Sequence, residues 1–390
     1  MDEATRLVRG GLARSQFDET AEAIYATSGY VYSSAAEAEA AFAGEHDRYI
    51  YSRYGNPTVS VFEERLRLLE GAEAAMATAS GMAAVFASLA SLLSAGDRLV
   101  SSRALFGSCH VIADEILPRL GVETELIDGT SLSEWERALA KGAKAVFLET
   151  PSNPGLEVID LRAVSDLAHA AGALVIVDNV FASPVLQKPL ELGADIVVYS
   201  ATKHIDGQGR TMGGAVLGPA SYINETLMSF LRHTGPSLSP FNAWVLAKGL
   251  ETIRLRVEES CRTASELADR LEQDARVATV RYPTLLSHPQ YDLAKAQMTA
   301  GGTILTIDLG SKDSAFAFLD RLQLFDISNN VGDSKSLVTH PATTTHRRID
   351  PEARKAVGIG DGMVRLSIGL ESVADLHRTS IGRPADSPGS

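Results

Sequence analysis

The sequence predicts an α/β protein built around a mostly parallel sheet, and three observations support this fold class. Short β-branched runs alternate with helical stretches through the middle of the chain, which is typical of βαβ units. The runs are apolar almost throughout, as expected of strands buried on both faces. Several of them end in polar residues, among them Glu149, Asp178 and Ser200. Because ligands of open α/β sheets bind beyond the carboxyl ends of the strands, a site is expected at these residues.

Residues 1–56 are predicted to be an arm that packs on a neighbouring subunit. They hold six clustered tyrosines and one Ala/Glu-rich helical stretch near 35–43. Such a segment has too few aliphatic residues for a core of its own, so it must bury its apolar side chains elsewhere.

Two further domains are predicted, at 57–250 and 251–390. In the first, an α/β domain, helices are expected at 59–69, 80–93, 161–171 and 184–192, and strands at 98–101, 145–149, 173–178 and 195–199. The second is predicted to be a smaller α+β domain that begins with a long amphipathic helix at 251–274. Its other elements are expected to be strands at 302–309 and 364–368 and helices near 314–322 and 372–376.

The composition excludes several classes of partner. The net charge is −13, and an acidic surface repels phosphate backbones and anionic lipids, so nucleic acid and membranes are not expected partners. Two cysteines cannot form a disulfide framework, which fits a reducing compartment. The charged start has no apolar core behind it, unlike a secretory signal, and the longest apolar-rich stretch, 82–95, is too short to cross a bilayer. A soluble cytoplasmic protein is therefore expected.

The main candidate for chemistry is Lys203, in the segment Ser200-Ala-Thr-Lys-His-Ile-Asp-Gly207. A lysine just after a buried strand, with hydroxyls one and three residues before it, suits an aldehyde cofactor that carries a phosphate. The lysine amine would form the Schiff base, and Ser200 and Thr202 would donate hydrogen bonds to the phosphate. For an isolated lysine, a solvated surface charge is the more common explanation.

A second candidate is Asp178, at the end of the apolar run that begins at Ala173. A carboxylate there can pair with a protonated pyridine nitrogen and so make a cofactor ring an electron sink. The alternative is a helix N-cap. One helix and one strand separate Asp178 from Lys203, which predicts that both lie at neighbouring strand ends.

Two weaker motifs would hold a phosphate. Ala79-Ser80-Gly81-Met82 places glycine at a predicted helix start, where free N–H groups attract anions. Tyr51 and Arg53, in Tyr49–Pro57, offer a phenol and a guanidinium fork. A plain helix start and a solvated turn are the respective alternatives.

Taken together, these motifs resemble those of the cystathionine γ-synthase-like family of pyridoxal-phosphate (PLP) enzymes, also called the Cys/Met metabolism family. The resemblance runs in family order over nearly the whole chain. It rests on 49–58 (YIYSRYGNPT), 78–84 (TASGMAA), 148–154 (LETPSNP), 177–179 (VDN), 199–207 (YSATKHIDG) and 364–371 (VRLSIGLE). It implies the fold-type I PLP-dependent transferase fold, with a seven-stranded type of sheet and a smaller α+β domain.

The resemblance also implies residue roles. Lys203 would carry the cofactor and shuttle protons, and Asp178 would pair with the pyridine nitrogen. The cofactor's phosphate and ring would be held by Ser80, Gly81, Met82, Phe106, Ser200, Thr202 and, from a neighbouring subunit, Tyr51 and Arg53. The active site would thus be shared across a dimer, and tetramers of such dimers are usual in this family.

The substrate is expected to be bound by Arg365, Asn153, Asn330 and Tyr51. In such relatives the residue matching Arg365 clamps the substrate α-carboxylate, and the residue matching Asn153 meets the cofactor's phenolic oxygen or that carboxylate. A structural ion pair is the alternative for Arg365. His340 and His346 lack convincing ligand partners, so no metal site is predicted.

Two departures from the family bear on activity. Phe106 stands where many relatives have a tyrosine, so it can stack on the cofactor ring but cannot transfer a proton. Asn330-Val-Gly-Asp333 stands where relatives have Ser-Leu-Gly-Gly. Expelling a thiolate benefits from a general acid, whereas expelling a carboxylate from an ester, followed by attack of hydrosulfide, needs little such help.

The predicted activity is therefore γ-replacement of O-succinyl-L-homoserine by sulfide, giving L-homocysteine and succinate, as in the O-succinylhomoserine sulfhydrylase branch of the family. Three alternatives stay open: the O-acetyl substrate, a cystathionine γ-synthase, and a γ-lyase acting on cystathionine or methionine. A nucleotide-binding Rossmann protein is disfavoured because Gly207-Gln-Gly209 lacks the G-x-G-x-x-G setting. A catalytically dead interaction module fits poorly with Lys203, Asp178 and Arg365 all being present.

Overall fold

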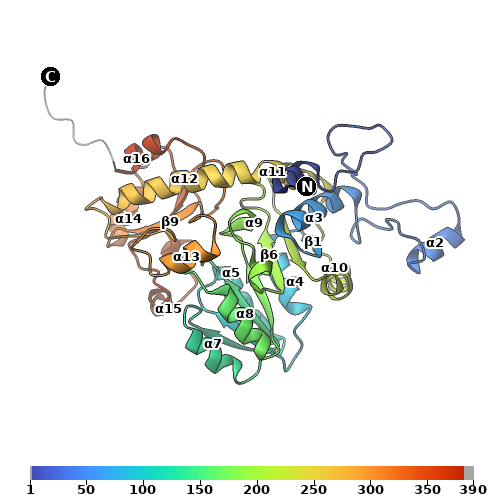
Figure 1. The fold of residues 1–390 in the computed structure, drawn as a ribbon, viewed down its shortest axis with the longest axis horizontal. Coiled ribbons are helices and arrows are strands. Elements are labelled where there is room, and N and C mark those ends of the chain that lie inside the picture. Colours follow the sequence, from blue (N-terminus) through green and yellow to red (C-terminus); the bar gives the residue numbers. More distant parts are fainter. Residues whose placement is uncertain (1, 382–390) are drawn as a thin grey trace.

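The computed structural model describes residues 2–381, which form two sheets surrounded by helices (Figure 1). The strands of the main sheet are β1 (Ala74–Thr78), β2 (Arg98–Ser102), β3 (Glu123–Ile127), β4 (Ala145–Glu149), β5 (Leu174–Asp178), β6 (Ile196–Ser200) and β7 (Gly214–Gly218). They lie in the order β1-β7-β6-β5-β4-β2-β3, and only β7 runs antiparallel to its neighbours. The prediction of an α/β fold with a mostly parallel seven-stranded sheet is confirmed.

Helices cover both faces of this sheet. In and around the main domain they are α3 (Pro57–Glu70), α4 (Gly81–Ala90), α5 (Gly107–Val111), α6 (Leu117–Arg119), α7 (Leu132–Leu139), α8 (Leu161–Ala170), α9 (Ser183–Leu186), α10 (Met228–Thr234) and α11 (Pro240–Glu251), with wide π turns at Ile112–Ile116 and Tyr222–Leu227. Alternate residues of β4 enter different cores: Val146 and Leu148 pack on one face, and Ala145 and Phe147 on the other. The apolar runs seen in the sequence are therefore explained by burial on both faces.

The prediction of one continuous helix at 184–192 is wrong. The segment forms two short pieces, α9 and a 3₁₀ turn over Pro189–Leu192. Pro189 cannot donate a backbone hydrogen bond, and it keeps Lys188 out of helical geometry, at φ −116° and ψ 84°.

The smaller sheet lies at the far end of α12 (Ile253–Glu272), which runs from the main domain across to it (Figure 1). Its strands are β8 (Thr279–Arg281), β9 (Ile304–Asp308), β10 (Asp326–Ile327), β11 (Leu337–Thr339) and β12 (Met363–Ser367), in the order β10-β11-β12-β9-β8. Its helices are α13 (Tyr291–Gln297), α14 (Lys312–Leu319), α15 (Pro351–Ala356) and α16 (Val373–Ile381), with a 3₁₀ turn at Pro341–Thr343. Residues 382–390 of the predicted C-terminal domain lie outside the described residues.

The N-terminal arm leaves the body of the molecule. After α1 (Glu3–Arg9) a long loop leads to α2 (Ala35–Phe42), which stands apart from the rest of the chain (Figure 1). Phe17, Val31 and Phe42 are 80%, 91% and 67% exposed. Exposed apolar side chains on a projecting segment are typical of a surface that another chain covers. Within residues 2–381 no helix is both long and apolar enough to cross a membrane.

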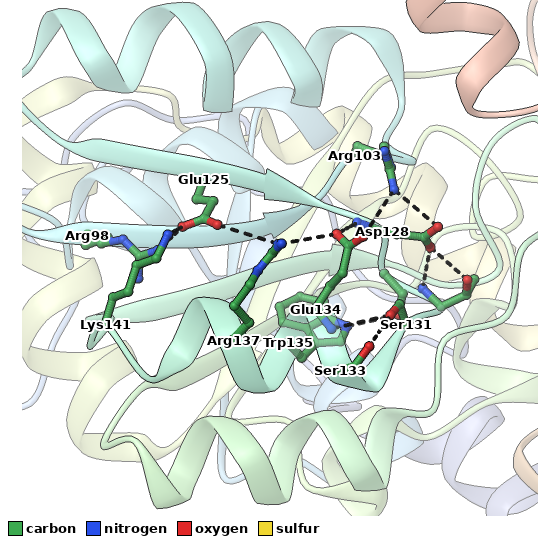
Figure 2. Close-up of polar contacts among 12 residues, drawn as sticks. Arg98, Arg103, Glu125, Asp128, Ser131, Ser133, Glu134, Trp135, Arg137 and Lys141 are labelled. Carbon is green, nitrogen blue, oxygen red and sulfur yellow. Dashed lines mark hydrogen bonds and ion pairs between the residues drawn. The ribbon is translucent and has the colours of Figure 1, made fainter.

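Charged side chains line the open edge of the main sheet at β3. Glu125 on this strand pairs with Arg98 and with Lys141, whose Nζ lies 2.8 Å from Glu125 Oε2, and Arg137 lies between Glu125 and Glu134 (Figure 2). Charged edge strands resist pairing with further strands. The charges at β3 therefore protect this edge from pairing with further strands. They are separate from the polar residues at the strand ends that form the site.

Arg65 is buried where the arm meets the body, and its loss is expected to destabilise the fold. Its Nη2 lies 2.5 Å from Glu22 Oε1 and its Nη1 lies 3.2 Å from Glu251 Oε1. Arg65→Met should lower the free energy of unfolding by about 3–5 kcal/mol, because Glu22 stays buried with one partner fewer. Arg67→Met, which breaks a surface pair with Glu64, should cost only about 0–1 kcal/mol. Equal losses in urea unfolding would contradict this difference.

Candidate active site

Lys203 lies in the loop that follows β6, and its amine is held inside the molecule. The side chain is half-buried, and Nζ donates a hydrogen bond to Asn330 Oδ1 at 2.5 Å. Burial, followed by the charge of Arg365, lowers the pKa of Lys203 to about 8. A lysine with a lowered pKa is unprotonated more often near neutral pH, which is what a nucleophilic amine requires.

Asp178 ends β5, which pairs directly with β6, so the predicted adjacency of these two strand ends is correct. The carboxyl is 7% exposed, and burial raises its pKa to about 7. The Val180 N–H donates to Oδ1 at 3.1 Å, and the Cys109 Sγ lies 3.9 Å from Oδ2. A buried carboxylate that lacks a cationic partner is costly, and a cation placed against it would favour its ionised form. A protonated pyridine nitrogen would be such a cation.

Glu149 is a second buried carboxyl beside Asp178. Its place at a strand end predicted that it lies near the site, but no specific role was predicted for it. It ends β4 in register with Asp178 and is 2% exposed. Burial, and then the charge of Asp178, raises the pKa of Glu149 well above its usual range. Its Oε2 accepts the Phe106 N–H at 2.6 Å, so it anchors the residue that precedes α5. The signal available in the sequence was its place at the end of a strand next to the one that ends in Asp178.

The start of α4 forms a close corner with the end of β6. Ser80 caps the helix, since its side chain accepts the Ala83 N–H at 3.2 Å. A Cβ on Gly81 would lie 2.4 Å from Ser200 Cβ, so only glycine allows this approach. The Thr202 hydroxyl, from the same loop as Lys203, accepts the Gly213 N–H at 3.1 Å. The unpaired N–H groups of the first turn, beside Ser200, make a ready site for an anion such as a phosphate.

Gly81→Ala is expected to weaken cofactor binding by at least about tenfold, because the added methyl group would push Ser200 away from the helix start. Titration of the apoprotein with pyridoxal phosphate, followed by absorbance, measures this. Gly360→Ala is the matched control, since a Cβ there meets nothing closer than 3.9 Å. Equal affinities of the two variants would argue against a phosphate at this corner.

Arg365 lies on β12 and is 2% exposed. Its Nη1 donates to Asn153 Oδ1 at 2.9 Å, and its Nη2 donates to the Asn329 and Asn330 carbonyls at 2.9 and 3.3 Å. Burial lowers the pKa of Arg365 to about 10, and its Nε is buried without a hydrogen-bond partner. Within residues 2–381 its hydrogen-bond partners are amide oxygens and carbonyls, and Glu149 acts on it only as a nearby charge. A ligand carboxylate would offer the guanidinium a directly bonded anion.

Tyr51 and Arg53 do not join this group within one chain. Tyr51 is 41% exposed, and the Arg53 guanidinium lies over its ring at 5.2 Å and bonds to the Arg232 carbonyl. Both belong to the arm region, where Arg53 lines a cavity of about 1140 Å³ beside α10 that neither Lys203 nor Asp178 lines. Their assignment to a neighbouring subunit's site stays a prediction.

Comparison with known proteins identifies the family of this chain. The sequence profile described as "Cys/Met metabolism PLP-dependent enzyme" matches residues 4–379. The chain belongs to this family. The predicted resemblance is therefore confirmed, and pyridoxal phosphate is the cofactor of the family.

Similar proteins include several members of the Cys/Met metabolism family. The chain is 62% identical over 381 residues to an O-succinylhomoserine sulfhydrylase of Mycobacterium tuberculosis, covering 96% of this chain and 94% of the relative. It is 40% identical over 376 residues to an L-methionine gamma-lyase of Porphyromonas gingivalis, covering 96% and 94%. Among solved structures, a putative O-acetylhomoserine (thiol)-lyase of Campylobacter jejuni superposes with a TM-score of 0.94 at 30% identity, covering 98% of this chain and 99% of that chain. That structure contains a lysine joined to pyridoxyl phosphate.

The residues of this chain fit the cofactor. The Lys203 amine, the Asp178 carboxylate and the corner at Gly81 offer partners for an aldehyde, a ring nitrogen and a phosphate. Cys109 was not predicted from the sequence, because its contact with Asp178 depends on how α5 packs against β5.

Proposed function

We propose that this chain catalyses γ-replacement, converting O-succinyl-L-homoserine and sulfide to L-homocysteine and succinate in methionine biosynthesis. The observation that carries the proposal is the 62% identity, over 96% of the chain, to the mycobacterial O-succinylhomoserine sulfhydrylase. Phe106 supports the same assignment, because succinate leaves as a stable carboxylate and needs no phenolic acid at that position.

The chain's own residues divide the work as follows. Arg365, oriented by Asn153, binds the substrate α-carboxylate. Lys203 removes the proton from the substrate Cα, and proton movement to and from Cβ lets succinate leave Cγ and hydrosulfide add there before the Cα proton is returned. Asn330 orients the Lys203 amine. Asp178 holds the proton on the cofactor's ring nitrogen, and bound pyridoxal phosphate supplies an electron sink for the charge that develops at Cα. Phe106, fixed through its N–H to Glu149, packs in the site without exchanging protons.

The proposal also covers the domain organisation, the oligomeric state and the cellular location of the protein. Residues 1–56 act as an arm, 57–250 as the cofactor-binding domain and 251–390 as the C-terminal domain, which agrees with the two sheets at 74–218 and 279–367. Tyr51 and Arg53 complete the site of a neighbouring subunit, within a homotetramer built of dimers that share active sites. The two buried free cysteines and the acidic composition support a reducing, cytoplasmic setting.

The deciding experiment compares substrates with the purified holoenzyme. Homocysteine should form from O-succinylhomoserine and sulfide with a higher kcat/KM than from O-acetylhomoserine. With cysteine in place of sulfide, faster formation of cystathionine would assign a cystathionine γ-synthase instead. Release of ammonia and 2-oxobutyrate from methionine or cystathionine as the main reaction would assign the γ-lyase activity named for the Porphyromonas relative.

A further inference from the structure

His204, the residue after Lys203, is bonded at both ring nitrogens. The residue is only 3% exposed. Nδ1 lies 3.1 Å from the Val180 carbonyl oxygen, and Nε2 lies 2.7 Å from the Thr303 hydroxyl. Val180 follows β5 in the main domain, whereas Thr303 directly precedes β9 of the smaller sheet. One imidazole therefore connects the lysine loop with both sheets.

The two partners fix the tautomer of this ring. Burial, and then the charge of Arg256, lowers the pKa of His204 to about 4, so the ring is neutral and carries one proton. A carbonyl oxygen can only accept, which places that proton on Nδ1, donated to Val180. Nε2 then accepts the hydrogen bond of the Thr303 hydroxyl. Both ring nitrogens are satisfied without a charge on the imidazole.

The bond to Val180 links His204 to Asp178 through a single residue. The Val180 N–H donates to Asp178 Oδ1 at 3.1 Å, while the Val180 carbonyl accepts from His204. A shift of the ring would thus move the residue that orients the carboxylate. Since Lys203 and His204 are adjacent in the chain, the same shift would move the lysine.

The ring also supports the loop that holds the lysine amine. Gly332 packs against it so closely that a Cβ would lie 3.0 Å from two ring carbons and 2.7 Å from the His204 backbone nitrogen. Asn330, which accepts the hydrogen bond of Lys203 Nζ, lies in the same loop. The backbone of His204 is held independently, because Arg256 Nη1 donates to its carbonyl at 2.9 Å.

We propose that His204 is a positioning residue that fixes Lys203 relative to Asp178 by its two neutral hydrogen bonds, without touching substrate or cofactor. The inference rests on the proposed function in that Lys203 binds pyridoxal phosphate. A purely structural histidine would affect stability alone, whereas a positioning residue also affects how fast the lysine captures the cofactor.

Three variants separate the two bonds. His204→Asn keeps a donor near the Nδ1 position, His204→Gln keeps an acceptor near the Nε2 position, and His204→Leu keeps neither. His340→Leu is the matched control, because His340 is also 3% exposed and its nitrogens lie 2.9 Å from Thr343 Oγ1 and 2.7 Å from the Asp361 carbonyl. The apoprotein is mixed with pyridoxal phosphate, quenched with borohydride at set times, and the modified Lys203 peptide is quantified by mass spectrometry. Urea unfolding of each apoprotein measures stability separately.

His204→Leu is expected to slow attachment to Lys203 by about 100-fold, because a small displacement of reacting groups is enough for such a loss. In His204→Asn the attachment rate should fall by about tenfold or less, since this variant keeps the bond toward Asp178. In His204→Gln the rate should fall further than in His204→Asn. His340→Leu should attach the cofactor at the wild-type rate even if it unfolds at lower urea.

Each contrary result overturns the inference. Attachment in His204→Leu within twofold of wild type would show that the imidazole does not position the lysine. An equally large fall of the attachment rate in His340→Leu would show that the effect reflects general stability. Slower attachment in His204→Asn than in His204→Gln would exclude coupling through Val180. Attachment needs no acyl-homoserine, so a failure of the proposed function in the sulfide assay would leave this comparison intact.

Discussion

Lys203→Ala is expected to lose turnover by at least about 10²–10⁴-fold, the contribution of one positioned acid–base group, while the protein remains folded. The substituted side chain is half-buried, and its amine bonds only to Asn330 among the hydrogen bonds of the described residues. Removing it therefore leaves one amide oxygen to find another partner. Because this amine is the group proposed to move the proton at the substrate Cα, its loss should remove that step.

The comparison with Lys203→Arg makes this test specific. Arginine keeps the positive charge but is not deprotonated at physiological pH, so it should be as inactive as alanine. Steady-state formation of homocysteine measures activity, and borohydride trapping should give no modified peptide at position 203 in either variant. Lys188→Ala, at a lysine that pairs with Glu3 instead, should keep wild-type turnover. Normal activity of Lys203→Ala would refute the assignment of the catalytic amine.

The predicted strands are those whose apolar runs stand out in the sequence, whereas β1, β3, β7, β8, β10 and β11 were not predicted. The strands at 98–102, 145–149, 174–178 and 196–200 lie within a residue or two of their predicted places, since their apolar side chains fill both cores. β1 (AAMAT) and β7 (GAVLG) escaped prediction because alanine and glycine carry little strand preference. Glycine in β7 has a tertiary cause: a Cβ on Gly214 would lie 2.3 Å from the Ser80 carbonyl oxygen.

The site was predictable to the extent that it is encoded in local motifs. Asp178 ends a strand, Arg365 lies within one, and Lys203 lies in the loop that follows a third; the apolar pattern reveals all three strands. Glu149 and Cys109 could not be assigned, since their contacts depend on strand register and on how α5 packs. Tyr51 and Arg53 are predicted to act in a neighbouring subunit's site, and the pattern of one chain cannot place them there.

Asp178→Asn is expected to lower kcat by about 10²–10³-fold, the usual cost of removing one electrostatic partner from a reacting centre. The amide keeps the shape of the side chain and can still accept the Val180 N–H at Oδ1. What it loses is the negative charge that is proposed to keep a proton on the cofactor's ring nitrogen. The visible absorption band of the bound cofactor should therefore change its pH dependence, which a spectral titration measures.

The same substitution should stabilise the apoprotein at alkaline pH. The pKa of Asp178 in the folded apoprotein is about 7, raised by burial from the usual 3.8. Between these values the folded state binds more protons than the unfolded state, so this group makes stability fall as pH rises from about 4 to 7. Asparagine removes that loss. At pH 8 the free energy of unfolding of the variant, measured with urea, should therefore exceed that of the wild type by about 2–4 kcal/mol, with little difference at pH 4.

Comparison of Glu149→Gln with Asp178→Asn distinguishes a charge that faces the cofactor from one that is only buried. Its amide oxygen can still accept the Phe106 N–H, and it too removes a buried acid whose pKa is raised. This variant should also gain apoprotein stability at alkaline pH, yet it should keep kcat within about tenfold of wild type because it loses no more than part of one hydrogen bond. A loss of kcat as large as that of Asp178→Asn would mean that turnover responds to the summed charge of both carboxyls. Asp178 would then have no special place at the ring nitrogen.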